Sequence, residues 1–271
     1  MGNFLLSSSK TAFMRKGQIS FFIILAVILI FGVILFQYVD GRLGGIPYAQ
    51  QVFEDRVQTV KNTVQACVDK TAEDALFLFG MQGGLIFPLL DFLEGVEGVP
   101  PQTVHFGDYE VNTFQYVGFN IIPSKEFLEK YQLAEYMRLE LPKCVDWSLF
   151  RDLNITSGNI NASASILDEK VLFNIKYPLV IRTKERQSSL DRFTSEQPIR
   201  LAGILAQASD LVNAGKLNLG YFDATMVTSS PYNITVSLTK DETTFIYSIT
   251  DPKSMLRGKP YTLLFAARFM P

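Results

Sequence analysis

Residues with reactive side chains are few in this chain, and none forms a recognisable catalytic motif. The sequence contains one histidine, His105, and two cysteines, Cys67 and Cys144, too few for a zinc site built from cysteine and histidine. A serine hydrolase would have to use His105, and no G-x-S-x-G sequence is present. Walker, HExxH and EF-hand motifs are absent as well. The sequence therefore predicts no metal ion, no cofactor and no enzymatic activity.

Two groups of residues could act on a sugar or bind one. Adjacent acidic residues occur at Glu54-Asp55, Asp168-Glu169 and Asp241-Glu242. Neighbouring positions do not converge on one face of a helix or strand, so we interpret these acids as solvated surface. A glycosidase pair of carboxylates would have to be assembled by the fold. Four aromatic residues could line a sugar-binding surface, or could belong to the core: Tyr116, Tyr131, Tyr136 and Trp147.

A long apolar segment is the strongest signal in the sequence. Residues 19–36 read ISFFIILAVILIFGVILF and contain no charged side chain. As a helix this segment is about 27 Å long, close to the hydrocarbon core of a bilayer at about 30 Å. Gln18 and Tyr38 extend it to the two interfaces. We therefore predict a transmembrane helix over residues 18–38 in contact with a lipid bilayer; the alternative is a buried core helix.

The charges that flank this segment predict its orientation. Lys10, Arg15 and Lys16 precede it, and no acidic residue does. The positive-inside rule then keeps the N-terminus in the cytoplasm and places the region after Tyr38 outside the cell. A cleaved secretory signal peptide is the alternative, but no small-x-small cleavage site follows the apolar run. We expect a single-pass protein of the cell membrane with an extracellular C-terminal region.

The junction between the basic and apolar segments resembles a family. Residues 15–20, RKGQIS, followed at once by the apolar run, are similar to the archaeal class III signal peptide of type IV pilin-like proteins and archaellins. The resemblance implies that a prepilin-type peptidase cuts between Gly17 and Gln18, and that the apolar helix then self-associates. Many pilins carry glutamate at the fifth mature position, where this chain has Phe22. The rest of the chain resembles uncharacterised archaeal single-span surface proteins.

Two features of the remaining sequence agree with an extracellular location. A disulfide between Cys67 and Cys144 is permitted there, with two separate buried thiols as the alternative. Three N-x-S/T sequons follow the apolar run, and they make the chain a candidate glycoprotein: Asn154, Asn161 and Asn233. Nucleic-acid binding is not expected, because 27 acidic residues outnumber 25 basic ones and no basic run occurs.

Periodicity and turn residues predict the order of elements after the membrane segment. We expect a flexible break over residues 39–47 and a mostly helical module with a small hairpin over residues 48–150. A polar linker over residues 151–163 precedes a second module over residues 164–271, an antiparallel sheet with one helix. The first helix is expected to bury one stripe, formed by Phe53, Val57, Val60, Val64, Cys67, Thr71, Ala75 and Leu78.

Finer predictions concern the ends of the helices. Residues 80–84, GMQGG, are expected to end a first helix that runs from about Tyr48 to Phe79, Ser124 to cap the next helix, and Pro142 to end it. The helix of the second module is expected to begin at Thr194.

These observations predict an α+β fold with an N-terminal transmembrane helix preceded by a basic leader over residues 1–17. They favour a membrane-anchored surface protein without enzymatic activity, either a pilin-like, minor filament subunit or an adhesive ectodomain. The alternative is a signal-anchored extracellular module that binds or hydrolyses a ligand.

Overall fold

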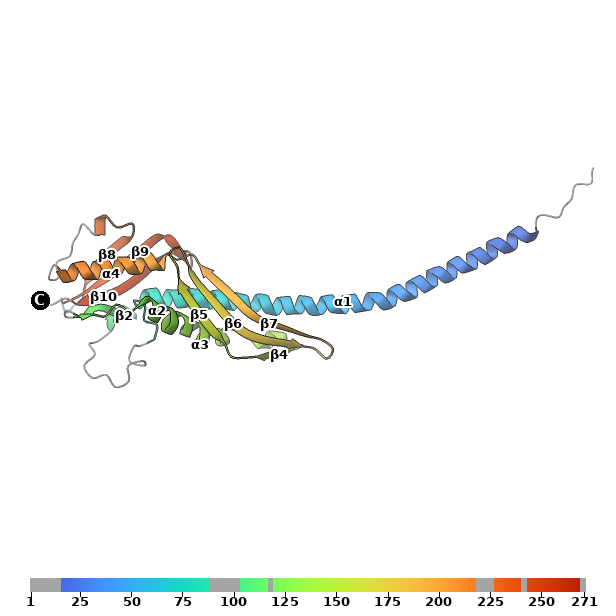
Figure 1. Cartoon of the computed structure of the whole chain (residues 1–271), viewed down its shortest axis with the longest axis horizontal. Helices are drawn as coiled ribbons and strands as arrows, with labels where there is room; N and C mark the ends of the chain where they lie inside the picture. The colour runs from blue at the N-terminus through green and yellow to red at the C-terminus, as the bar shows by residue number, and fades with distance from the viewer. Residues whose placement is uncertain (1–15, 88–102, 117–118, 218–226, 240–242, 269–271) are drawn as a thin grey trace, which may run out of the picture. The chain divides into compact units, whose positions relative to one another are not determined.

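The chain has an α+β fold, as predicted. The computed structural model describes residues 16–87, 103–116, 119–217, 227–239 and 243–268. The chain divides into two compact units, residues 1–56 and residues 57–271. Helix α1 (Lys16–Met81) contributes to both units. Figure 1 shows α1 leading into the second unit, which contains all the strands that the structure describes.

The backbone of α1 is helical through residues 39–47, so the flexible break predicted there is wrong. The prediction rested on three glycines and on Pro47, which lacks a backbone N–H donor and normally kinks or ends a helix. Glycine in a helix costs about 1 kcal/mol relative to alanine but keeps its backbone N–H donor. The flanking turns therefore extend through the segment, although its composition disfavours a helix.

The predicted apolar stripe of α1 is confirmed and packs within its own unit. In residues 57–81 the stripe is buried at every predicted position except Leu78, which is half-buried. The Tyr261 hydroxyl donates a hydrogen bond to the Leu76 carbonyl at 3.2 Å, and burial raises the pKa of this phenol. The Gln65 amide donates to the Thr194 carbonyl at 2.8 Å. This part of α1 therefore contacts strands of both sheets.

The C-terminal end of α1 lies within the predicted stop over residues 80–84, two residues beyond the expected end at Phe79. The helix ends at Met81, and Gly83 and Gly84 adopt positive φ angles of 68° and 86°. The Gly84 N–H donates to the Phe79 carbonyl at 2.7 Å, which is the i→i−5 bond of a Schellman cap. One turn earlier, a Cβ on Gly80 would lie 2.4 Å from the Thr262 carbonyl oxygen. Because Gly80 has no Cβ, the backbone of α1 can lie directly against the backbone of the sheet at Thr262.

Substituting Gly80 with alanine should destabilise the protein, although alanine is the better helix former. The gain in helix propensity is about 1 kcal/mol, whereas overpacking against a backbone oxygen costs about 1–3 kcal/mol. We expect a net loss in denaturant unfolding. Gly32→Ala is the matched control, because a Cβ there meets no atom within 4 Å. Equal or higher stability of the Gly80 variant would contradict the close packing.

The larger sheet combines strands from both predicted modules. Its order is β1-β2-β10-β9-β8, and β3 pairs with β2. The strands are β1 (Thr103–Phe106), β2 (Tyr109–Tyr116), β3 (Phe119–Asn120), β8 (Asn233–Leu238), β9 (Thr244–Leu256) and β10 (Lys259–Arg268). Strands β8, β9 and β10 are antiparallel as predicted, but β10 pairs with β2 in parallel. The sheet is therefore mixed and extends across the predicted linker.

Aromatic side chains align across the centre of this sheet. The ring centroids of Phe114 on β2 and Phe265 on β10 lie 4.7 Å apart, and those of Phe265 and Tyr247 on β9 lie 4.9 Å apart. Burial raises the pKa of Tyr247 to about 12. Stacked cross-strand rings stabilise a sheet beyond the area they bury, so this row supports the parallel pairing of β2 with β10.

The smaller sheet is a long hairpin with two short strands added to one side. Strand β6 (Val171–Arg182) pairs with β7 (Gln187–Gln197) on one side and with β4 (Asn154–Ser157) and β5 (Asn161–Ile166) on the other. The register shifts between Lys176 and Leu179, where Pro178 lacks the N–H donor of a regular strand. The inner face of β6 is buried and its outer face is largely exposed.

Two predictions in this region are wrong. Residues 154–157 and 161–163 of the predicted linker lie in strands β4 and β5, because β6 offers backbone partners to this polar segment. Thr194 lies in β7, and the helix α4 (Leu201–Leu217) begins seven residues later. Side chains from Phe193 to Gln197 are alternately buried and exposed, as in a strand. Pairing in the sheet therefore prevails over the local preference of Thr194 for the start of a helix.

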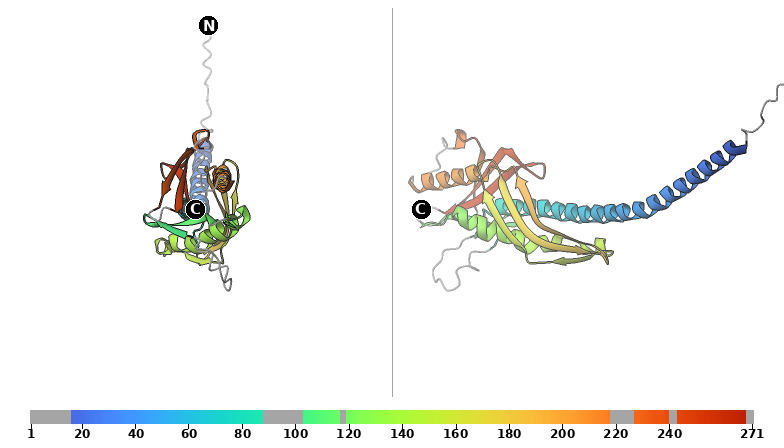
Figure 2. Two further views of the ribbon diagram at one scale, coloured as in Figure 1. Left: turned by 90° about the vertical axis from the view of Figure 1, so that its left-hand side faces the viewer. Right: turned by 45° about the vertical axis from the view of Figure 1, so that its right-hand side comes forward.

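A helical segment lies against β5. It comprises α2 (Lys125–Phe127), the π-helical turn η2 (Leu128–Leu133) and α3 (Ala134–Cys144), and a 3-10 turn η3 (Trp147–Phe150) follows. Ser124 accepts a hydrogen bond from the Phe127 N–H at 3.2 Å, as predicted for the cap. Pro142 lies inside α3, two residues before its end, so the predicted end is early. Figure 2 gives two further views of these elements.

Candidate functional site: the apolar part of α1 and the exposed sheet surfaces

The apolar part of α1 exposes its side chains all around the helix. Every side chain described from Ile23 to Tyr38 is exposed, with Phe31 and Phe36 at 65% and 68%. A helix that is hydrophobic on all sides normally lies in a membrane or in the core of an assembly. No atom lies within 4 Å of a Cβ built on Gly32, which borders a shallow groove together with Leu29 and Phe36. This surface is the candidate functional site.

The predicted leader lies at the start of the described chain. Helix α1 begins at Lys16, so Gly17 and Gln18 lie in its first turn, whereas residues 1–15 lie outside the described residues. The side chains of Gln18 and Phe22 are likewise outside them. Among the helices that the structure describes, none is long and apolar enough to cross a membrane.

The structure brings the two cysteines together. Cys67 on α1 and Cys144 at the end of α3 form a disulfide, with Cα atoms 5.7 Å apart. The bond joins positions 77 residues apart and links α1 to the helical segment that lies against β5. The chain therefore contains the covalent link that the sequence allowed.

All three sequons lie on strands with their asparagines exposed. Asn154 begins β4, Asn161 begins β5 and Asn233 begins β8. The hydroxyl residue of each sequon, two positions later, is also exposed, so both recognised side chains lie on the same face of the strand. The three sites are thus accessible in the folded protein.

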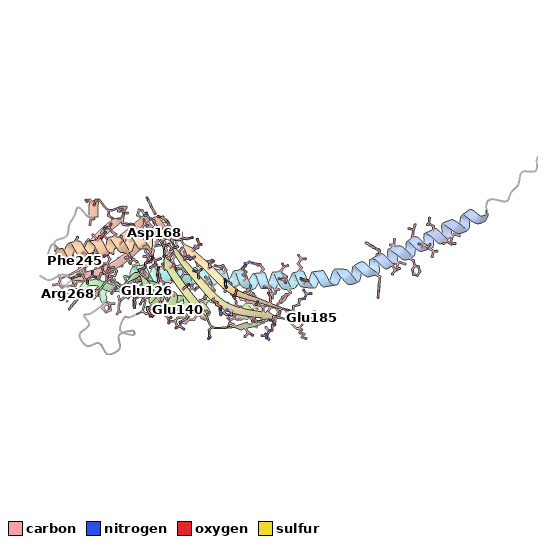
Figure 3. The ribbon with its side chains drawn as sticks, in the orientation of Figure 1. Glu126, Glu140, Asp168, Glu185, Phe245 and Arg268 are labelled. Atoms are coloured by element: carbon pink, nitrogen blue, oxygen red, sulfur yellow. A yellow bond between two sulfur atoms is a disulfide. The ribbon has the colours of Figure 1, made fainter. Side chains whose placement is uncertain are left out.

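Acidic and histidine side chains do not converge on a catalytic centre in the described residues. His105 is 84% exposed and lies 3.6 Å from Glu110, its cross-strand neighbour in a hairpin. Within the described part of the chain, no group of three histidine, cysteine or acidic residues could hold a metal ion. Figure 3 shows Glu126, Asp168 and Glu185 well apart on the second unit.

The four candidate aromatic residues have separate partners. Trp147 packs against Tyr177, with ring centroids 6.5 Å apart, and Tyr136 packs against Phe87 at 6.4 Å. Tyr131 lies next to Phe127, and the guanidinium of Arg268 lies over Tyr116. These contacts are those of local packing and give no common sugar-binding platform.

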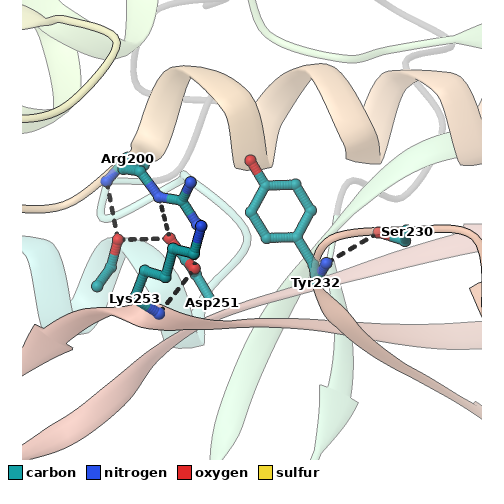
Figure 4. A network of polar contacts seen from close by, with 6 residues as sticks. Arg200, Ser230, Tyr232, Asp251 and Lys253 are labelled. Carbon is teal, nitrogen blue, oxygen red and sulfur yellow. Dashed lines mark hydrogen bonds and ion pairs between the residues drawn. The ribbon is translucent and has the colours of Figure 1, made fainter.

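A buried ion pair at the start of α4 had no signal in the sequence. The guanidinium of Arg200 donates two hydrogen bonds to the Asp251 carboxylate, at 2.9 and 2.6 Å (Figure 4). The Asp251 side chain is fully buried, and it also accepts from the Ser254 hydroxyl at 2.5 Å and from the Lys253 N–H at 3.0 Å. The Arg200 N–H in turn donates to the Ser254 hydroxyl at 3.0 Å.

This network fixes α4 to β9 at a strand irregularity. The register between β9 and β10 shifts after Asp251, which pairs with Tyr261. Burial acts to raise the pKa of Asp251, but hydrogen bonds from Arg200 and Ser254 outweigh it, and the pKa lies below its ordinary value. The carboxylate is therefore a structural anion and not a proton donor.

Comparisons with protein-family models, curated proteins and solved structures find no match for this chain. The argument about function therefore depends on the residues and surfaces described above.

Proposed function

We propose that this chain is a membrane-anchored extracellular surface protein, a type IV pilin-like minor filament subunit or adhesive ectodomain. The leader directs processing between Gly17 and Gln18 by a prepilin-type peptidase. The apolar helix then anchors the protein in the bilayer and can pack against equal helices. The compact unit over residues 57–271 is presented outside the cell, where its disulfide is stable and its sequons are accessible.

The observation that supports the proposal most strongly is the fully exposed apolar surface from Ile23 to Tyr38. Leaving such a surface in water is costly, at about 25 cal/mol for each Å² of apolar area, so lipid or protein must cover it. The same helix continues into the compact unit without interruption. An anchor and a folded ectodomain connected by one helix form the organisation expected for a pilin-like protein.

Leader processing gives a direct test of the proposal. Full-length protein produced in an archaeal cell that has the peptidase should yield a mature chain that begins at Gln18, as read by N-terminal mass spectrometry. Gly17→Val should abolish processing and leave the 17-residue leader attached, because a branched side chain replaces the glycine at the cleavage site.

Gly2→Val is the matched control, since it makes the same change within the leader but away from the junction. Its mature chain should still begin at Gln18. A wild-type chain that retains Met1, or one that begins near residue 40, would contradict the proposed leader.

A further inference from the structure

The outer face of the smaller sheet presents cations in regular rows. Lys176 on β6 pairs directly with Arg192 on β7, and Asn161 on β5 completes that row. Six residues further along β6, Arg182 forms a row with Gln187 and Asn154. Directly paired residues of an antiparallel sheet share one face, and all of these side chains are exposed. We call Lys176, Arg182 and Arg192 the cationic patch.

Carboxylates of the protein neutralise this patch only in part. In the described part of the chain, no acidic side chain forms an ion pair with Lys176 or Arg182. Arg182 donates to the neutral Gln187 amide at 2.8 Å, and Arg192 lies 3.8 Å from Asp191. The patch is positive although the whole chain has a net charge of −2.

The row of Lys176 and Arg192 is also unfavourable for folding. Like charges placed directly opposite on two strands destabilise the sheet, whereas opposite charges stabilise it. A glutamate at position 176 would pair with Arg192 and remove this repulsion. Local rules of stability are most often broken at functional sites, so the row indicates a binding surface.

We propose that the cationic patch binds an acidic polysaccharide outside the cell. The proposal rests on the proposed function and names the partner of an adhesive ectodomain. Lys176 and Arg182 are about 20 Å apart along β6, a distance that an extended polymer can span and a single small anion cannot. Next to Lys176, on the side away from Arg182, Asn174, Ser163 and Thr194 form an exposed row of amide and hydroxyl groups suited to sugar hydroxyls.

Binding should be measured with full-length protein in neutral detergent, made in a host that does not glycosylate it. Asn161 lies opposite Lys176 and Asn154 opposite Arg182, so the proposal requires both sequons to be unoccupied in the native protein, and a glycan found at either position would overturn it. Polygalacturonate serves as the acidic polysaccharide, dextran as the neutral one and duplex DNA as a polyanion without sugar carboxylates. We expect binding to polygalacturonate that weakens with salt, and none to dextran.

Lys176→Glu should weaken polygalacturonate binding at least ~10-fold, because it removes one charge-assisted contact and neutralises Arg192. The same variant should melt about 1–4 °C higher, because a favourable cross-strand pair replaces a repulsive one. Loss of binding with a gain in stability separates this effect from misfolding. Lys259→Glu, an exposed site at the start of β10, is the control for net charge and should bind as the wild type does.

Three outcomes of the binding measurements would also overturn the proposal: no binding of polygalacturonate, equal binding by Lys176→Glu, or binding of duplex DNA as tight as that of polygalacturonate. Each is independent of leader processing, so failure of this proposal and failure of the proposed function can be told apart.

Discussion

Replacing Arg200 with methionine is expected to lower the free energy of unfolding by about 3–5 kcal/mol at neutral pH. Methionine retains much of the aliphatic stem but leaves the Asp251 carboxylate, which is fully buried, without its cation. The Ser254 hydroxyl and the Lys253 N–H remain as partners, and they cannot neutralise the charge. Denaturant unfolding followed by circular dichroism would measure the loss.

The loss should shrink as the pH falls. In the wild type the pKa of Asp251 is lowered, so its contribution to stability is present above the unfolded value of about 3.9 and is lost as the pH falls further. In the variant, burial is no longer opposed by Arg200, so the pKa of Asp251 should rise above that value. Acidification from pH 7 towards pH 4 then removes a buried charge and stabilises the variant relative to the wild type.

Arg151→Met is the matched control, because the Arg151 side chain is exposed and interacts with Asp146, a carboxylate that is also exposed. An exposed ion pair contributes about 0–1 kcal/mol, so this variant should unfold close to the wild type at every pH. If Arg200→Met lost less than about 1 kcal/mol, or if its loss did not depend on pH, the buried ion pair would not have the role described.

Removing the disulfide should cost roughly 4 kcal/mol. The double variant Cys67→Ala/Cys144→Ala opens a loop of 77 residues, and the loss is the entropy that the bond takes from the unfolded chain. The buried surface changes little, since each substitution removes only one sulfur atom. Thermal or denaturant unfolding of the variant would measure the effect.

Reduced wild-type protein provides the control, since it should lose about as much stability as the double variant without any substitution. Peptide mapping without reductant should recover Cys67 and Cys144 in one linked species. Recovery of free thiols at both positions would contradict the bond, and so would a double variant as stable as the oxidised wild type.

Local signals predicted the parts of the fold that depend on neighbouring residues. The apolar stripe of α1 has a period that only a helix satisfies, and Gly83 and Ser124 have conformational or hydrogen-bonding preferences that act within one turn. The start of α4 could not be predicted in this way. Thr194 resembles a helix cap, but β6 offers it a backbone partner from another part of the chain, and pairing in the sheet prevailed.

Long-range features had weaker signals or none. The two cysteines could be paired because the chain has no others. Arg200 and Asp251 are 51 residues apart in a chain with many charged residues, so nothing in the sequence distinguishes them. The cationic patch depends on the register of β6 with β7, which a shift of one residue would change completely. Its rows can be identified only from the pairing of β6 with β7 in the structure.

The position of β10 between β2 and β9 has a consequence for biosynthesis. A ribosome makes β1, β2, β8 and β9 before β10, yet β2 and β9 have no contact in the sheet until β10 lies between them. The nascent chain therefore cannot complete its larger sheet before β10 has been translated. The hairpin of β1 with β2 and the pair of β8 with β9 can each form earlier, and β10 then joins them into one sheet.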